Sequence, residues 1–447
     1  MNFKKLSATV LAMSMTAGLM TGCGQQADTQ TSESQADTQT TASAESTSTE
    51  SASAQADTGI EPCEIQFWHY MTGNLETTLT NLTDKFNSEN EYGITVKLVN
   101  QGNASDLQSK LTTNAAAGTL PDMAQAYNNW FTEYVNEVVH LDDFVANDFD
   151  DYDDIIQSYR DENSEYGFIS GMPFNKSTYV YFYNKTLFDE LGLEAPKTWD
   201  DVKAIGEKVL AEKNLASLGY DDRAGMLEAI LKQNGSDYVT KDGVQFDNEN
   251  GQAAVEYILD LYNNGYARLA GDGEFFSTLL SNNLIAAYVG SSAGVSYITA
   301  DGWELGVAPL PAGKESAANM AGTNLIMFSK DENAQKAVWE YMKYLTSTEV
   351  TTEWAVETGY LPVRTSAFES EDYQNFMTEN PAAAAAYAQK DAFFYSPVFD
   401  GSNDLRSAMN TTLEEIIINN TDKSTDNDVD AATALSQLVD AANNAIK

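Results

Sequence analysis

Cysteine and histidine are both scarce in this chain of 447 residues, which has two of each. Cys23 lies near the N-terminus, and after it only Cys63 remains, so the rest of the chain can form no internal disulfide. A disulfide-stapled scaffold of the kind found in small exported domains is therefore excluded. We interpret Cys63 as a buried free thiol.

The residue sets of the common catalytic sites are missing too. The sequence contains no H-E-x-x-H zinc motif, no paired cysteines, no phosphate-binding P-loop and no G-x-S-x-G nucleophile motif. His69 is the only plausible general base, and His140 is expected on the exposed face of a helix. We therefore expect a protein that is not an enzyme, with no cofactor and no metal.

Carboxylates are the one group present in excess, with 67 aspartates and glutamates against 25 lysines and arginines. Nothing singles out the carboxylate pair of a glycosidase, so a secreted glycoside hydrolase is kept only as an alternative of another class. One run of aspartates lacks the glycine and closing glutamate of a calcium loop, and we interpret it as a solvated acidic surface. It consists of Asp148, Asp150, Asp151, Asp153 and Asp154.

The formal net charge of −42 narrows the possible partners. An acidic surface repels nucleic acid and anionic lipid headgroups, so neither is expected to bind. After the N-terminal segment, no apolar run reaches the roughly 18 residues of a membrane-spanning helix.

The N-terminal segment has the layout of a secretory signal. Lys4 and Lys5 supply positive charge, and the apolar run at residues 6–20 is too short for a stable membrane span. It leads into L-M-T-G-C at residues 19–23, which is typical of a lipoprotein processing site. We predict a lipoprotein signal peptide at residues 1–22 and lipidation of Cys23. A plain signal peptide with a chance cysteine is the alternative.

Residues 23–59 are predicted to form a disordered tether behind the lipidated cysteine. The segment consists largely of Ser, Thr, Gln, Ala, Asp and Glu, which bury too little apolar surface to offset the entropy of ordering. As a flexible coil it would hold the following domain roughly 30 Å from its anchor. The expected location is the extracellular face of the cytoplasmic membrane, reached through the lipid anchor.

From residue 60 onward, the hydrophobic pattern predicts alternating strands and helices. Residues 65–70 alternate as a strand, residues 75–86 repeat at helical spacing and residues 94–98 alternate again. This is the unit of a right-handed parallel crossover, which is typical of an α/β fold. The length exceeds what one hydrophobic core usually supports, so two lobes are expected.

Later segments continue the alternation. Strands are expected at residues 179–183 and 284–289, and a capping box from Thr198 to Asp201 opens a helix between them. From about residue 332 the pattern favours helices.

Several motifs resemble the family of extracellular solute-binding proteins for sugars and polyols. They are F-W-H-Y-M-T-G at residues 67–73, P-F-N-K-S-T at 173–178, P-K-T-W at 196–199 and T-G-Y-L-P at 358–362. Their order and spacing hold over about residues 60–440. The resemblance implies the receptor of an ABC importer, which delivers its ligand to the permease subunits, and we expect it to be a monomer.

The resemblance also implies a periplasmic-binding-protein-like fold. Two discontinuous α/β lobes would enclose a ligand cleft, because the chain crosses between the lobes in its middle. On this basis we expect lobe 1 to comprise residues 60–174 plus 305–332. Lobe 2 would comprise residues 175–304 plus 333–447.

Within the family, the resemblance is greatest to the receptors of glycerol-3-phosphate, and it implies a set of ligand contacts. The residues matched to phosphate contacts are Ser177, Ser291, Gly322, Tyr360 and Arg406. Trp199 of the K-T-W motif would pack on the carbon skeleton of the ligand, or would serve packing of the protein alone.

Two positions depart from the glycerol-3-phosphate receptors. Ala104 stands where they have tyrosine, and Asn128 stands where they have glutamate. Both changes fall where ligand hydroxyls should be recognised, so the ligand is expected to differ from glycerol-3-phosphate. The small side chain of Ala104 leaves space for a larger substituent.

Two features of the residues themselves favour an anion site. The G-S-S-A-G segment at residues 290–294 follows a buried strand and would expose backbone N–H groups at the start of a helix. Arg406 is one of only five arginines and would clamp a phosphate or carboxylate, unless it is a surface arginine on the final helical segment. We expect a glycerophosphodiester or another phosphorylated polyol. A neutral oligosaccharide is the alternative, since aromatic side chains are abundant.

Overall fold

The computed structural model describes residues 59–271, 274–424 and 427–446. The predicted signal peptide, Cys23 and the tether, apart from Gly59, lie outside the described residues. Strands and helices alternate through the first part of the described chain, and helices dominate from Glu332 onward, as predicted. None of the helices in these ranges is both long and apolar enough to span a membrane.

The chain enters its main sheet through the predicted parallel crossover. Strand β1 (Glu64–His69) is followed by helix α1 (Asn74–Glu89) and strand β2 (Thr95–Asn100). The two strands pair in parallel along their whole length. Leu79 and Phe86 are buried on one face of α1, because residues spaced by three or four positions share a side of a helix.

One mixed sheet of nine strands organises the described residues. Its main path runs β2-β1-β3-β10-β4-β8-β5, with β11 on β10 and β9 on β4. The remaining strands of this sheet are β3 (Met123–Ala126), β4 (Met172–Asn184), β5 (Gly219–Tyr220), β8 (Ala287–Ser291), β9 (Leu305–Ala308), β10 (Ala318–Met327) and β11 (Phe393–Phe394). A separate hairpin consists of β6 (Val239–Thr240) and β7 (Gly243–Val244).

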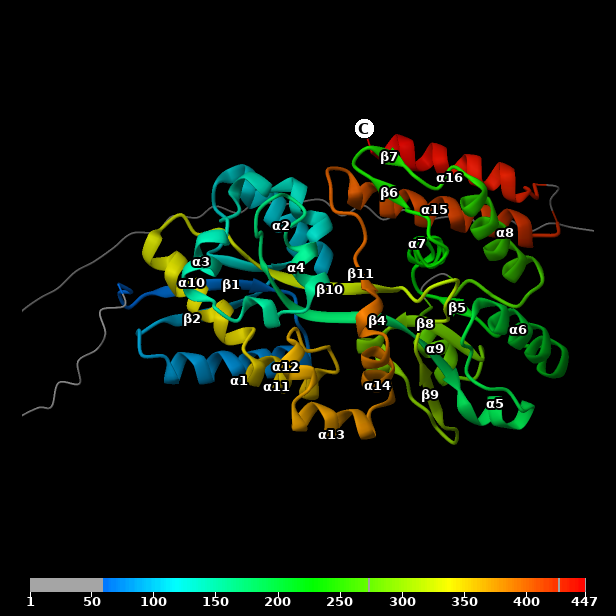
Figure 1. The fold of residues 1–447 in the computed structure, drawn as a ribbon, viewed down its shortest axis with the longest axis horizontal. Helices are drawn as coiled ribbons and strands as arrows, with labels where there is room; N and C mark the ends of the chain where they lie inside the picture. The colour runs from blue at the N-terminus through cyan, green and yellow to red at the C-terminus, as the bar shows by residue number, and fades with distance from the viewer. Residues whose placement is uncertain (1–58, 272–273, 425–426, 447) are drawn as a thin grey trace, which may run out of the picture. The chain divides into compact units, whose positions relative to one another are not determined.

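Strands β4 and β10 join the two ends of this sheet, as Figure 1 shows. The first half of β4, from Met172 to Thr178, pairs antiparallel with β10. Its second half, from Tyr179 to Asn184, pairs with β8 and β9. Because β10 also pairs with β3, the two α/β lobes share these long strands.

Helices cover both faces of the sheet. Along the first half of the chain they are α2 (Ala104–Ala117), η1 (Asn128–Glu133), η2 (Val135–Glu137), α3 (Asp142–Asp148), η3 (Tyr152–Asp154), α4 (Gln157–Glu162), α5 (Lys185–Leu191) and α6 (Trp199–Lys213). Then follow α7 (Arg223–Gln233), α8 (Glu249–Asn263), α9 (Phe276–Ser281) and η4 (Ser292–Tyr297).

The C-terminal helices lie on opposite sides of β4 in Figure 1, with α13 and α14 below it and α15 and α16 above it. They are α10 (Glu332–Leu345), α11 (Thr348–Thr358), α12 (Thr365–Phe368), α13 (Glu371–Glu379), α14 (Pro381–Ala388), η5 (Lys390–Ala392), α15 (Ser402–Thr421) and α16 (Ala431–Ala445).

Three clusters of buried apolar side chains fill the space between sheet and helices. The first joins β1 and α1 to α10–α14, the second joins α6–α8 to α15 and α16, and the third packs α2 and η1 on β3. Strand β4 contributes Val180 and Phe182 to the first cluster and Tyr179 and Tyr181 to the second. Alternation along a strand requires this division between its faces.

The packing of the C-terminal helices suggests a different assignment of these helices to the two lobes, and the lobe boundaries are a proposal. Residues 332–388 pack in the cluster that contains β1 and α1, whereas α15 and α16 pack on α7 and α8. This arrangement favours placing residues 332–388 with residues 60–174. The family resemblance had implied that residues 333–447 all belong to the second lobe.

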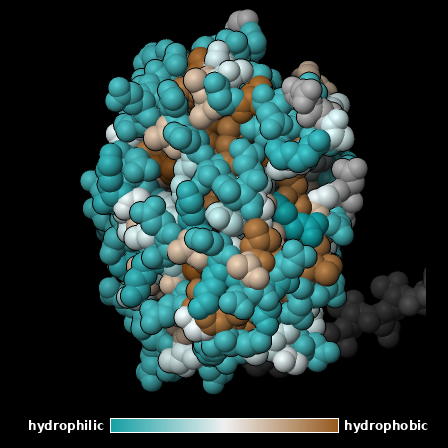
Figure 2. Space-filling view, turned by 90° about the vertical axis from the view of Figure 1, so that its right-hand side faces the viewer, coloured by the Kyte–Doolittle hydropathy of each residue, from teal (hydrophilic) through white to brown (hydrophobic). Residues whose placement is uncertain are grey.

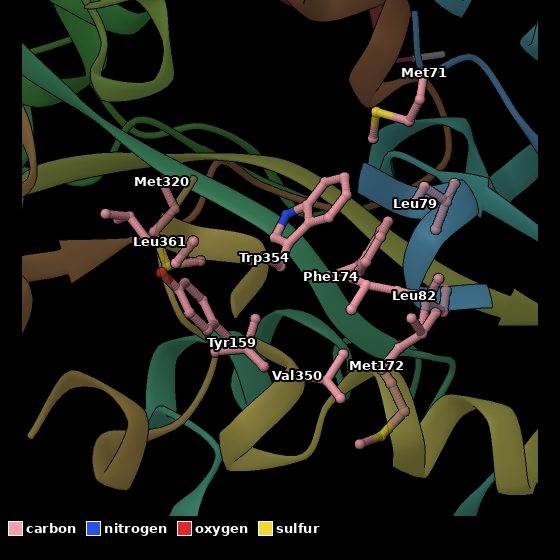
Figure 3. Packing of buried hydrophobic residues seen from close by; sticks show 14 of the residues in the cluster. Met71, Leu79, Leu82, Tyr159, Met172, Phe174, Met320, Val350, Trp354 and Leu361 are labelled. Atoms are coloured by element: carbon pink, nitrogen blue, oxygen red, sulfur yellow. The ribbon is translucent and has the colours of Figure 1, made fainter. Parts of the chain in front are cut away.

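An aromatic stack anchors the start of β4, as Figure 3 shows. Phe174 stacks on Trp354 of α11, with ring centroids 4.8 Å apart and an interplanar angle of 29°. Leu361 and Met320 are buried in the same cluster. The P-F-N-K-S-T and T-G-Y-L-P motifs therefore share one core, although they lie far apart in the sequence.

The side of the molecule shown in Figure 2 is dominated by hydrophilic residues, and apolar ones appear there only in separate patches. Among the described residues, the exposed large apolar side chains are Phe275, Leu284, Tyr297 and Ile418. This surface agrees with the high net charge of the sequence.

Four local predictions were wrong. The thiol of Cys63 is free but only partly buried, whereas a buried thiol was expected. His140 lies in a loop between η2 and α3 rather than on a helix, and its ring stacks on Phe168 with centroids 3.6 Å apart. The strand predicted at residues 284–289 is shifted to Ala287–Ser291, which leaves Leu284 exposed. The segment after this strand forms only the short 3-10 helix η4, so the expected α-helix N-terminus, which would favour an anion, does not form there.

The aspartate run is not simply a solvated surface. Arg364 is almost fully buried and donates hydrogen bonds to Asp151 at 2.5 Å and Asp154 at 3.3 Å. Asp148 accepts a hydrogen bond from the Trp339 indole at 3.2 Å. In the described part of the chain, no group of histidine, cysteine or carboxylate side chains could hold a metal ion. The carboxylates of this run therefore form hydrogen bonds to Trp339 and Arg364, which lie in distant parts of the sequence.

Replacing Arg364 should destabilise the protein markedly. Arg364→Ala removes the buried cation and leaves Asp154 without its charged partner, which should lower the free energy of unfolding by about 3 kcal/mol. Urea unfolding of both proteins measures the difference. The control is Lys85→Ala, because Lys85 forms an exposed pair with Glu349 and should contribute less than about 1 kcal/mol. Equal effects of the two substitutions would contradict the structural role of Arg364.

Candidate ligand-binding site

A cavity of about 420 Å³ opens between elements of the two lobes. Its walls come from α2, η1 and α4 on one side and from α7 and α15 on the other, with β4, β10 and residues 396–398 between them. This volume is typical of a small-molecule pocket. Four residues that the sequence predicts as ligand contacts line it, namely Ala104, Asn128, Gly322 and Arg406.

Strand pairing brings three of the predicted phosphate contacts together. Ser177 on β4 pairs with Ala321 on β10, and Ser291 on β8 pairs with Tyr179, two positions further along β4. The Ser291 hydroxyl donates a hydrogen bond to the Ser177 hydroxyl over 2.9 Å. The two serines are not among the cavity-lining residues, but Ala321 and Tyr179 are.

Gly322 occupies a position that only glycine fits. Its φ of +106° lies in the left-handed region, and a β-carbon there would be 2.0 Å from the carbonyl oxygen of Asn175. The register of β10 against β4 shifts between Gly322 and Asn324. Such a bulge changes the direction of the strand where it borders the cavity.

Tyr360 reaches the same region from a different segment. The backbone N–H of Leu361 donates to the carbonyl oxygen of Lys176 over 2.7 Å, which places the T-G-Y-L-P motif beside P-F-N-K-S-T. Burial raises the pKa of the Tyr360 phenol to about 12, and the phenol of Tyr127, a cavity residue, adds to the shift. Tyr360 is therefore a neutral hydrogen-bonding group next to the cavity.

Trp199 lies apart from these residues. It begins α6, is buried in the second cluster and does not line the cavity. Its indole N–H donates to Gln233 Oε1 over 2.5 Å, and Gln233 in turn donates to the carbonyl oxygens of Pro311 and Ala317. This position agrees with the packing alternative for the K-T-W motif.

Arg406 is held at the cavity wall by an ion pair. Its guanidinium donates to the Asp222 carboxylate, to the Tyr179 hydroxyl at 3.2 Å and to the Ser396 hydroxyl at 3.3 Å. Burial opposes the charge of Arg406, but the neighbouring Asp222 carboxylate raises its pKa above the ordinary value. The side chain keeps 37% of its exposure and lines the cavity, so it remains accessible to a ligand.

A buried carboxylate lies on the same side of the cavity as Arg406 and shares the Ser396 hydroxyl with it. Glu228 on α7 is 4% exposed and accepts hydrogen bonds from the Ser396 hydroxyl at 2.6 Å and the Asn319 amide at 3.5 Å. Burial raises the pKa of Glu228 to about 7, although Ser396 and Arg406 oppose the shift. The cavity therefore offers hydrogen-bond acceptors as well as a cation.

Glu162 on α4 is a second acidic wall residue, and it pairs with the fully buried ammonium of Lys176. Burial lowers the pKa of Lys176, and Glu162 opposes that shift. Asn128, the predicted polyol contact, donates to the Glu162 carbonyl oxygen over 2.9 Å and accepts from the Asn324 amide over 2.6 Å. Its amide is thus used within the protein, where it helps to position Glu162.

Sequence reasoning missed the contributions of Tyr179, Glu228 and Tyr238 to this cavity. For Tyr179 and Glu228, the sequence does contain a signal that could have indicated the contribution. Tyr179 begins the strand predicted at residues 179–183 and follows Ser177 by two positions, so the two side chains belong on one face if the strand extends back to Ser177. Glu228 interrupts an otherwise apolar stretch of α7, where a carboxylate is rarely buried without a partner.

His69 shows no catalytic arrangement. It is buried at the end of β1, and its Nδ1 accepts a hydrogen bond from the Met71 N–H over 3.2 Å. Burial lowers the pKa of its imidazole. The cavity-lining residues do not include it.

The model of the bacterial extracellular solute-binding proteins matches residues 81–386. Among curated proteins, the chain is similar to the sn-glycerol-3-phosphate-binding periplasmic protein UgpB of Yersinia pestis, with 28% identity over 355 residues, which cover 73% of this chain and 80% of the relative. The UgpB of Escherichia coli O1:K1 / APEC is 26% identical over 365 residues, which cover 76% and 82%.

Solved structures show the same fold. The cyclic alpha-maltosyl-1,6-maltose binding protein of Arthrobacter globiformis superposes with a TM-score of 0.76 at 23% identity, covering 86% of this chain and 99% of its own. UgpB of Mycobacterium tuberculosis, in complex with glycerophosphocholine, gives a TM-score of 0.72 at 20% identity, covering 86% and 98%.

The Glu228 carboxyl should make stability depend on pH. Its pKa is about 7 in the folded protein and 4.5 ordinarily, so the folded state binds more protons between these values. The contribution of Glu228 to the free energy of unfolding should therefore fall as the pH rises from about 5 to above 7. Glu228→Gln cannot ionise and should gain on the order of 2 kcal/mol relative to wild type over that range.

Urea unfolding at pH 5, 6, 7 and 8 measures this difference. The matched control is Glu256→Gln on α8, where the side chain is exposed and the two curves should stay parallel. A constant difference between wild type and Glu228→Gln would contradict the predicted titration.

Proposed function

The chain belongs to the bacterial extracellular solute-binding proteins, and from this membership we propose that it captures a phosphorylated polyol, in particular a glycerophosphodiester, for an ABC importer. One observation supports the proposal above the others. Residues of both lobes line a single cavity in which Arg406 remains accessible.

The donors around β4 support a phosphoryl group as part of the ligand. Arg406 supplies a guanidinium, whose hydrogen bonds to phosphate are charge-assisted and directional. Ser177, Ser291 and Gly322 lie at neighbouring positions of β4, β8 and β10. The relatives named for glycerol-3-phosphate are similar over most of the chain.

The acidic wall residues favour a diester over a monoester. A phosphomonoester carries nearly two negative charges at neutral pH. The wall residues Glu162 and Glu228 would repel it, as would Asp222, which lies behind the wall on Arg406. A diester brings a single charge, which Arg406 can meet. Its hydroxyl groups can donate to the same carboxylates, and the small side chain of Ala104 leaves room in this cavity for one of its two alcohols.

A neutral oligosaccharide is the second candidate, and the ion pair of Arg406 favours it. Because Asp222 already neutralises the guanidinium, the cavity has no unpaired cation among its described lining residues. Tyr127, Trp130 and Tyr238 add aromatic surface on which sugar rings can pack. Several solved proteins of this fold bind maltose-type sugars.

We further propose that the receptor is a monomer without catalytic activity and that the lipid on Cys23 anchors it to the membrane. The cavity holds carboxylates and an arginine but no histidine or cysteine among its lining residues. Lobe closure around the bound solute, rather than chemistry, would then prepare it for delivery to the permease.

Truncation of Arg406 tests the ligand class. Arg406→Ala removes the charge-assisted bonds and should weaken binding of glycerophosphoglycerol by tens-fold or more, whereas maltotriose should lose much less. Calorimetry on the purified protein measures both affinities. The matched control is Arg223→Ala, because Arg223 pairs with Glu414 and does not line the cavity.

Thermal unfolding of the ligand-free proteins should accompany this titration, since Arg406→Ala also leaves Asp222 without its charged partner. Tight binding of maltotriose without measurable affinity for any phosphorylated polyol would overturn the phosphoryl proposal. The receptor role would stand in that case.

The anchor has its own test. Without the thiol of Cys23 no lipid can be attached, so Cys23→Ala should appear in the medium or accumulate as an unprocessed precursor. Fractionation of cells that express either form measures the distribution. If the processed variant stayed with the membrane as fully as wild type, the lipoprotein assignment would be wrong.

A further inference from the structure

A second cavity of about 490 Å³ adjoins the first. The two cavities share four lining residues, Glu228, Tyr238, Pro397 and Val398. These residues come from α7, from the residue before β6, and from the segment between β11 and α15. The cavities are thus neighbours, and we refer to these four shared residues as the partition between them.

We propose that the second cavity is a ligand subsite, which takes a hydroxylated unit, a sugar or polyol, joined to the unit beside Arg406. The proposal deepens the proposed function and rests on it, because it concerns the same bound solute. It predicts that the natural ligand has two units and is longer than a single polyol phosphate.

An unpartnered hydroxyl at the partition points to such a ligand. Tyr238 is 9% exposed, and its buried hydroxyl is one of several tyrosine hydroxyls that have no hydrogen-bond partner among the described residues. Of these tyrosines, Tyr238 is the one that lines both cavities. The ring is fixed by stacking on Phe246, with centroids 5.5 Å apart and an interplanar angle of 15°. A buried hydroxyl in this state is costly unless a ligand or water completes its hydrogen bond.

Glu228 provides the complementary group at the same partition. Its carboxylate already accepts from Ser396, and its charge acts on the neighbouring Tyr238 phenol. A sugar or polyol hydroxyl can accept from Tyr238 and donate to Glu228 at once. A phosphate has only acceptor oxygens, so it would satisfy Tyr238 but not the carboxylate.

The rest of the second cavity also suits a hydroxylated unit. Aromatic side chains offer faces on which the C–H groups of a sugar ring pack, and they are Phe394, Tyr395 and Phe399. Charged groups of both signs are present, including Lys232 and Asp237, which approach to 3.8 Å. Hydroxyls, which both donate and accept, match such a mixed lining better than a net charge does.

Ser396, in the segment between β11 and α15, forms hydrogen bonds with residues of both cavities. Ser396 donates to Glu228 at the partition and accepts from Arg406 at 3.3 Å in the first cavity. A solute that spans the partition would therefore contact groups that are already coupled by hydrogen bonds.

Affinities for short and long ligands test the subsite. The probes form two series whose members carry equal charge, the methyl ester of sn-glycerol-3-phosphate with glycerophosphoglycerol, and maltose with maltotetraose. In the series that binds, the longer member should bind at least tenfold tighter to wild type. Thr240 lines the second cavity but not the first, so Thr240→Trp should fill the second cavity alone. This variant should abolish the gain in affinity of the longer ligand, while the shorter ligand should bind as it does to wild type.

Two further variants secure the interpretation. Thr240→Ser keeps the hydroxyl that accepts from the Asp242 N–H over 3.2 Å, and it should retain the gain. Tyr238→Phe removes only the unpartnered hydroxyl, so the ligand-free protein should be at least as stable to urea as wild type. Its affinity for the longer ligand should fall several-fold.

The possible outcomes test the subsite proposal and the ligand-class proposal separately. A length gain for maltotetraose alone would support the subsite and overturn the phosphoryl proposal, whereas a gain for glycerophosphoglycerol would support both. Equal affinity for the members of each series, or a gain that survives Thr240→Trp, would overturn the subsite. Absence of binding by all four probes would overturn it as well.

Discussion

The antiparallel pairing of β4 with β10 is the constraint on which the binding site depends. It brings the P-F-N-K-S-T segment against Gly322, where the absence of a β-carbon allows the two backbones to approach. The second half of β4 then carries Tyr179 to Arg406. Because both lobes share these strands, the same pairing sets the position of the cavity walls.

Charge inside the site is balanced differently from charge on the surface. The chain is strongly acidic, yet the accessible Arg406 and the buried Lys176 near the cavity each have a carboxylate partner, Asp222 and Glu162 respectively. Burying either member alone would be costly. Specificity then depends on hydrogen-bond geometry, since the cavity presents donors and acceptors together. The large negative charge outside is screened within about 8 Å at physiological salt and acts little on the cavity.

Much of the fold was predictable, because its signals are local. The crossover from β1 to β2 and the capping box of Thr198 and Asp201 are confirmed. The resemblance to the solute-binding receptors also singled out Gly322 and Arg406, and both line the cavity. Glu228 and Tyr238 escaped prediction, because a single polar residue in an apolar stretch does not reveal its partners. Those of Glu228 lie at Asn319 and Ser396, far along the chain.

The sequence by itself determined the α/β alternation, the helix-rich C-terminal part and the family, since periodicity, capping residues and short motifs act over a few positions. Only the tertiary structure decided which charges pair, that Trp199 bonds to Gln233, and that the helices from residue 332 to 388 pack beside α1. The Arg406–Asp222 contact joins residues 184 positions apart. Such contacts depend on how whole elements pack, and no local pattern in the chain encodes them.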